Sequence, residues 1–141
     1  MPRKTARKPR EPERDYSHRS LLDKLGVKPG QRICVLGVED AAFLKDLAAI
    51  APGAAHGKAQ KGSDVILLAA ENLKSLAQVK SLEPHLQRNG AIWVVYPRGQ
   101  QHIREADVMA AGKSAGLTDN KICRFSETHT ALRFVIPVAR R

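Results

Sequence analysis

The residues of this chain that could do chemistry stand just after its apolar runs, where the sequence changes from hydrophobic to charged. Glu39 and Asp40 follow one such run, Arg98 follows another, and His129 lies in a polar link between two further runs. Carboxylates beside an arginine can hold a charged ligand group, and an imidazole exchanges a proton near neutral pH. The candidate ligand-binding residues at these positions are Gly37, Glu39, Asp40, Glu71, Asn72, Arg98, Glu127 and His129.

Each candidate also has an ordinary structural explanation. Asp40 and Asn72 each precede a helical pattern and could cap it, a role worth about 1 kcal/mol. His129, in a polar turn, is typical of a surface residue. Arg98 could be a solvated arginine that pairs with Glu127, because the strands that these two residues follow are expected to be neighbours. With its several acids, the patch should be locally acidic on a basic protein.

The pattern for a nucleotide-type cofactor is incomplete. Such a site uses a glycine-rich turn after the first strand and an acid at the end of the next strand. This chain has only Gly37 in the first position, and residues 59–61 are Ala-Gln-Lys in the second. Glu39 and Asp40 would also repel a phosphate at the start of the following helix. We therefore expect no cofactor. The scattered histidines and the two separate cysteines, without HxH or HExxH spacing, predict neither a metal site nor a hydrolase centre.

Alternating strand and helix patterns must position these residues. Continuous apolar runs bounded by turn signals predict buried parallel strands, and apolar side chains at helical spacing predict helices between them. The carboxyl ends of parallel strands share one edge of a sheet, so the candidate residues should meet there. The expected strands are 33–36, a weak 55–59, 64–69, 91–96, 120–125 and 131–138. The expected helices are a short one ending near Leu25, one from Asp40 to Pro52, one capped by Asn72, a turn from Pro84 to Asn89-Gly90, and one from Ile103 to Ala115.

These elements predict an α/β fold with a doubly wound, mostly parallel sheet. The link between the last two strands is so short that they must form an antiparallel C-terminal hairpin. Cys34 and Cys123 should be buried on separated strands, so we expect no disulfide between them.

Charge suggests a second kind of partner. The 141 residues carry 24 Lys and Arg against 14 Asp and Glu, a net charge of +10, while 43% hydrophobic content argues against wholesale disorder. Residues 1–16 predict a disordered basic tail and residues 17–141 a single domain. No apolar stretch approaches the roughly twenty residues of a membrane span, and no signal peptide is evident, so we expect a cytoplasmic protein without membrane contact. The tail residues that could associate weakly with nucleic acid are Arg3, Lys4, Arg7, Lys8, Arg10 and Arg14.

Several short motifs carry a resemblance to a known family. They are Tyr16-Ser17, residues 24–30 (KLGVKPG), residues 96–99 (YPRG), residues 116–121 (GLTDNK), and Ser126-Glu127-Thr128 with residues 132–135 (LRFV). Over residues 16–138 the chain resembles the bacterial domain-of-unknown-function family numbered three thousand and fifty-two. Its pattern has a tryptophan where this chain has His129.

The resemblance implies a truncated Rossmann-like fold of the class I methyltransferase type. In the labels of that fold, the implied strand order is 2-1-4-5-7-6, with the third strand missing. The family implies no known chemistry.

Three functions stay open at this point. The first is a non-catalytic methyltransferase-like domain that binds a small ligand or a protein partner. The second is an S-adenosylmethionine-dependent methyltransferase with a degenerate cofactor loop. The third is sequence-indifferent association with nucleic acid through the basic tail and the basic body.

Overall fold

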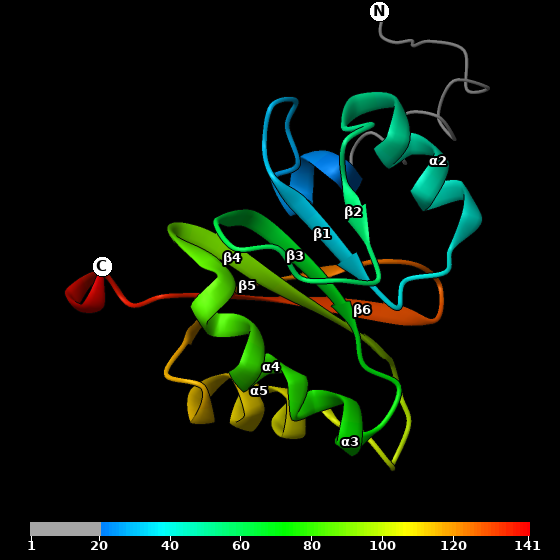
Figure 1. Ribbon diagram of the computed structural model, residues 1–141. Coiled ribbons are helices and arrows are strands. Elements are labelled where there is room, and N and C mark those ends of the chain that lie inside the picture. The colour runs from blue at the N-terminus through cyan, green and yellow to red at the C-terminus, as the bar shows by residue number, and fades with distance from the viewer. Residues whose placement is uncertain (1–20) are drawn as a thin grey trace, which may run out of the picture.

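A computed structural model describes residues 21–141 and contains one six-stranded sheet with helices on both faces (Figure 1). The predicted tail of residues 1–16, with its six basic residues, and the start of the predicted helix that ends near Leu25 lie outside the described residues. The strands are β1 (Ile33–Leu36), β2 (Ala55–His56), β3 (Ser63–Ala69), β4 (Leu86–Pro97), β5 (Thr118–Arg124) and β6 (His129–Val135). The helices are α2 (Ala41–Ile50), α3 (Leu73–Leu76), α4 (Gln78–Leu82), α5 (Glu105–Ser114) and the 3-10 turns η1 (Glu83–His85) and η2 (Val138–Arg140).

The sheet has the order β2-β1-β3-β4-β6-β5. Strands β2, β1, β3 and β4 pair in parallel, whereas β6 pairs antiparallel with both β4 and β5. The predicted doubly wound, mostly parallel sheet with an antiparallel C-terminal hairpin is confirmed. The order is also the one that the resemblance implied, with one strand missing.

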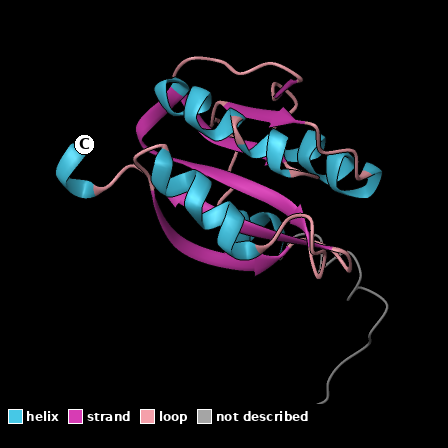
Figure 2. Cartoon of the chain, turned by 90° about the horizontal axis from the view of Figure 1, so that it is seen from below, coloured by secondary structure: helices cyan, strands magenta, loops and turns pink. Residues whose placement is uncertain are grey.

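Two helical layers cover the sheet. Phe43 and Leu47 of α2 pack on one face, together with a short helix over residues 21–25. Trp93 on β4 is fully buried on this face, and its indole N–H donates to the carbonyl of Leu25 over 2.9 Å. Helices α3, α4 and α5 cover the other face (Figure 1). The C-terminal segment that ends in η2 extends away from the sheet (Figures 1 and 2).

The sequence predicted that the Asn89-Gly90 pair ends a helical turn, and this prediction is wrong. The 3-10 turn η1 stops at His85, and β4 runs straight through both residues. A side chain at Gly90 would place its Cβ 2.8 Å from the carbonyl oxygen of Asp64, where the register of β3 against β4 shifts. Glycine is present because β3 comes too close for a Cβ, and the pair only imitates a turn signal.

Smaller differences concern element ends. β6 stops at Val135, because Pro137 has no N–H for the ladder and the chain turns into η2. α5 begins at Glu105, where Asp107 accepts a hydrogen bond from the backbone of Arg104, two residues later than predicted. The weak strand after α2 exists but holds only Ala55 and His56.

The cysteines lie on separated strands, and both are free thiols, as predicted. Cys34 on β1 is buried, and its sulfur lies 3.1 Å from the hydroxyl of Ser63. Cys123 is only half-buried, contrary to expectation, because β5 is an edge strand. Burial still raises the pKa of the Cys123 thiol, against the opposing effect of Lys24 and Lys121. Over residues 21–141, no helix is long and apolar enough to cross a membrane.

Candidate functional site

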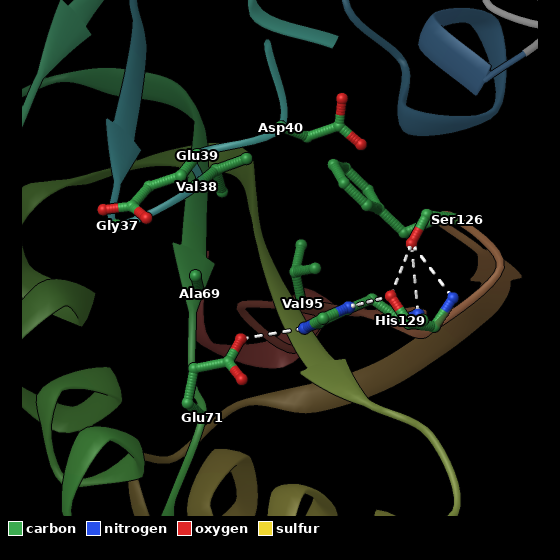
Figure 3. Close-up of a pocket in the computed structure, with 11 residues that line it drawn as sticks. Gly37, Val38, Glu39, Asp40, Ala69, Glu71, Val95, Ser126 and His129 are labelled. Carbon is green, nitrogen blue, oxygen red and sulfur yellow. Dashed lines mark hydrogen bonds and ion pairs between the residues drawn. The ribbon is translucent and has the colours of Figure 1, made fainter. Parts of the chain in front are cut away.

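A cavity of about 450 Å³ opens at the carboxyl edge of the sheet (Figure 3). Three segments form it: the loop after β1, the loop after β3, and the turn between β5 and β6. This is the edge at which parallel sheets bind their ligands, and the volume is within the usual range for a small-molecule site. The lining residues are Gly37, Val38, Glu39, Asp40, Ala69, Glu71, Val95, Phe125, Ser126, Thr128 and His129.

The loop after β1 supplies an acidic wall. Gly37 has a φ of 81°, a left-handed conformation that turns the chain sharply out of the strand. Glu39 and Asp40 follow at the cavity and are exposed. Asp40 also caps α2, since one of its carboxylate oxygens accepts the backbone N–H of Phe43 over 3.0 Å. Asp40 therefore has both the predicted capping role and a place in the lining of the cavity.

A hydrogen-bonded chain crosses the opposite side of the cavity. Oε2 of Glu71 lies 2.8 Å from Nε2 of His129, and Nδ1 of His129 lies 2.8 Å from the hydroxyl of Thr128 (Figure 3). An ionised carboxylate only accepts, so Nε2 carries a proton toward Glu71, and in the neutral ring Nδ1 accepts from Thr128. The side chain of His129 is 26% exposed, so the imidazole is not the freely solvated one that a polar turn suggested.

The turn between β5 and β6 holds His129 in place. The Ser126 hydroxyl accepts from the backbone N–H groups of Thr128 over 3.3 Å and of His129 over 3.2 Å. This local bonding fixes the turn without a glycine. The main chain of Glu71 is held as well, since its carbonyl lies 2.9 Å from Nε2 of His102.

Arg98 reaches the same turn from outside the cavity. Its guanidinium donates to the carbonyls of Ser126 and His129 over 3.1 and 3.0 Å, and to the hydroxyl of Thr130 over 3.1 Å. It also donates to the carbonyl of Glu127. The side chain is thus a clamp on the hairpin turn.

The expected ion pair between Arg98 and Glu127 is not formed. The two residues do meet, but through the main-chain carbonyl of Glu127, and the described residues show no ion pair with its carboxylate. Their strands are not neighbours either, because β6 lies between β4 and β5. A guanidinium that follows β4 faces the backbone of the turn that leads into β6, and carbonyl oxygens are its nearest acceptors.

The structure therefore divides the predicted site. Five candidates line the cavity: Gly37, Glu39, Asp40, Glu71 and His129. Three do not. Asn72 caps α3 by accepting from the backbone N–H of Ser75 over 2.9 Å, Glu127 is exposed in the turn, and Arg98 lines a second cavity of about 280 Å³.

That second cavity also contains Tyr96 and Glu105. Burial raises the pKa of the Tyr96 hydroxyl to about 12, and the neighbouring Glu105 carboxylate adds to the rise. Within residues 21–141, no group of three or more His, Cys, Asp or Glu could hold a metal ion.

Sequence reasoning missed the hydroxyls and the apolar floor of the cavity. Ser126 and Thr128 stood in the polar link that was singled out, so their position was the available signal. Val38, Val95 and Phe125 carry no such signal, because apolar residues at strand ends are mostly core. Phe125 packs against Phe43 of α2 with ring centroids 4.9 Å apart, which places an aromatic surface beside the acidic wall.

Comparison with known proteins identifies the fold. A SAM-dependent methyltransferase from Aquifex aeolicus matches with a TM-score of 0.64 and 13% identity, over 92% of this chain and 94% of that one. The N-methyltransferase NodS from Bradyrhizobium japonicum WM9 matches with a TM-score of 0.63 and 14% identity, over 90% and 98% of the two chains. Magnesium protoporphyrin IX methyltransferase from Synechocystis PCC 6803, solved with bound SAM, matches with a TM-score of 0.61 and 16% identity, over 87% of this chain and 77% of that one.

At these identities the likeness establishes a class I methyltransferase-like fold and nothing finer. No protein-family model and no curated protein matches the chain. Membership of the family of unknown function therefore stays a prediction.

Proposed function

We propose that this domain binds a small ligand with a positively charged group and an apolar portion, and that it does not transfer methyl groups from S-adenosylmethionine. The observation that carries the proposal is the 450 Å³ cavity, in which Glu39, Asp40 and Glu71 stand over an apolar floor. The ligand's cation would lie among the carboxylates, and its apolar part against Val95 and Phe125.

The carboxylates have acceptor capacity left for such a ligand. Asp40 uses one oxygen on the α2 backbone, and Glu71 uses one oxygen on His129. Each keeps a second oxygen. Among residues 21–141, no Lys or Arg lines the cavity, and His129 is the one lining group there that can carry positive charge. A cation is favoured here and an anion is not.

The chain lacks most of the residues that hold an adenosyl cofactor in this kind of fold. The loop after β1 offers one glycine where close approach to a cofactor backbone needs several. β2 ends at His56, and the segment that follows, through Ala59-Gln60-Lys61, contains no acid for ribose hydroxyls. These residues do not fit the group.

Methyl transfer is the second candidate, and one observation favours it. The matched structures reported above are methyltransferases, and they cover most of this chain. A degenerate loop with a cofactor held by other contacts would be consistent with that likeness. Cofactor affinity separates the two candidates.

Two fragments with the same carbon skeleton and opposite charge test the proposal. We expect 3-methylbutylamine to shift the backbone NMR signals of Gly37, Glu71 and His129 saturably, at concentrations on the order of millimolar for so small a ligand. The anion 3-methylbutanoate, which carries the same branched alkyl group, should leave them unchanged. Equal responses to both, or shifts elsewhere only, would contradict the proposal.

Two variants locate the effect in the cavity. Glu39→Gln removes a lining charge and should weaken the amine about two- to fivefold, since an exposed ion pair contributes ~0.5–1 kcal/mol. Glu127→Gln removes an equal charge from an exposed side chain of the same turn that does not line the cavity, and serves as the matched control. It should leave the affinity unchanged.

A further inference from the structure

A second charged surface lies on the strands of the C-terminal hairpin, at residues that do not line the cavity. Lys121 on β5 stands directly opposite Arg133 on β6 in the antiparallel register. Directly opposed residues of such a pair point to the same face, with Cβ atoms only about 5 Å apart. Like charges in that position destabilise a sheet, so this pair calls for an explanation.

The face that carries this pair is not the one covered by α5. Phe134 meets Gly112 of α5, so it points toward that helix. Successive residues of a strand point to opposite faces, so Arg133 points away from α5. The same alternation places Cys123, which is paired with Ala131, beside Lys121 and Arg133.

Two further cations border the pair. Lys24 belongs to the helix over residues 21–25, whose Leu22 and Leu25 pack in the same core cluster as Ala131 and Cys123. Arg141 donates from Nε to the carbonyl of Ile136, just after β6, over 2.8 Å. The pKa shifts agree with this placement: Lys24 and Lys121 act to lower the pKa of Cys123, and Arg141 lowers that of Arg133 beyond the effect of burial. We call Lys24, Lys121, Arg133 and Arg141 the cationic face.

No acid among residues 21–141 forms an ion pair with any of these four side chains. The one side-chain acceptor that Arg133 contacts there is neutral, Oδ1 of Asn120 at 3.3 Å. A group of cations with no acidic partner in the described part of the chain gains most from an external polyanion. Because the four come from a helix, two strands and the C-terminus, they present a broad surface rather than a point site.

We propose that the cationic face binds the phosphate backbone of a nucleic acid strand without reading its base sequence. Several separated cations suit a row of phosphates better than a single small anion. Base stacking has no platform here. Among the described residues, the aromatic side chains are all buried: Phe43, Trp93, Tyr96, Phe125 and Phe134.

The sequence adds a second argument. The basic residues between Arg3 and Arg14 precede Leu21 in the chain, and Lys24 follows it by one helical turn. Residues 1–16 carry six basic and three acidic residues, a net charge of +3, so +7 of the total of +10 belongs to the rest of the chain. None of the four residues of the cationic face lines the acidic cavity, so this proposal does not depend on the proposed ligand.

The test measures the salt dependence of binding by the full chain to fluorescein-labelled single-stranded RNA of 20 nucleotides, in two unrelated sequences. Each phosphate contact on a single strand contributes about −0.7 to the slope of log K against log [salt]. The double variant Lys24→Gln/Lys121→Gln should therefore reduce the magnitude of the slope by about 1.4 for both sequences.

Lys74→Gln/Lys80→Gln is the matched control. It removes the same charge from exposed lysines of α3 and α4, on the other side of the sheet. It should leave the slope unchanged. Equal losses in both double variants, no loss in the first, or a strong preference for one RNA sequence would overturn the proposal. Arg133→Gln alone, with an expected loss of about 0.7, gives an independent check from the strand.

Discussion

Replacing Arg98 by alanine should destabilise the protein much more than the loss of a surface ion pair would. The guanidinium makes three part-buried hydrogen bonds, to the carbonyls of Ser126 and His129 and to the hydroxyl of Thr130. At about 1 kcal/mol net for each bond, Arg98→Ala should lower the free energy of unfolding by about 2–3 kcal/mol. The fourth bond, to the exposed carbonyl of Glu127, adds little because water replaces it.

Urea unfolding measures this loss. Trp93 is the only tryptophan and is fully buried at the centre of the sheet, so its fluorescence reports unfolding of the domain. Glu127→Gln is the decisive control. Arg98 uses the carbonyl of Glu127 and not its carboxylate, so this change should alter stability by less than about 0.5 kcal/mol. Arg98→Lys should recover less than half of the loss, because an ammonium cannot reproduce the fork of donors.

An exposed ion pair would give a different result. In that case both Arg98→Ala and Glu127→Gln would cost less than about 1 kcal/mol, by similar amounts, and both effects would fade with added salt. That outcome would refute the clamp.

Three further predictions concern the body of the fold. Gly112→Ala gains about 1 kcal/mol of helix propensity, but its Cβ would clash with the buried ring of Phe134. The cost of overpacking should exceed this gain, so we expect the free energy of unfolding in urea to fall by about 1–2 kcal/mol. The loss should be smaller in a Phe134→Leu background. Since the pKa of Tyr96 is raised to about 12, its contribution to stability is complete below pH 10 and is lost as the pH rises toward 12. Tyr96→Phe should remove that alkaline loss; an unchanged pH profile would contradict it. In the native state, iodoacetamide should modify Cys123 slowly and leave Cys34 unmodified, as read by peptide mass spectrometry.

The sequence predicted the parts of the site that depend on local signals. Asp40 and Asn72 were recognisable as caps because a short polar side chain before an apolar helical pattern has few other uses. Strand ends were visible as changes from apolar to charged residues. Parallel strands share an edge, and that rule brought Glu71 and His129 together although 58 residues separate them.

What the sequence could not supply were side-chain directions and backbone acceptors. Carbonyl oxygens have no sequence signature, so the sequence indicates only the carboxylate of Glu127 as a partner for Arg98, through strands expected to be neighbours. Gly90 misled for a related reason: a glycine required by the close approach of β3 has the same letter as a glycine required by a turn. The contact of His129 with Thr128 and Glu71 depends on its rotamer, which only the packed turn fixes.

Calorimetric titration of the full chain with S-adenosylmethionine tests the central claim most directly. The cavity has an acidic wall and an apolar floor, yet the loop after β1 has a single glycine, and residues 57–61, which follow β2, contain no acid. The account predicts no saturable heat with a Kd tighter than about 1 mM. Saturable binding at micromolar concentrations would contradict it and would favour methyl transfer as the function of this fold.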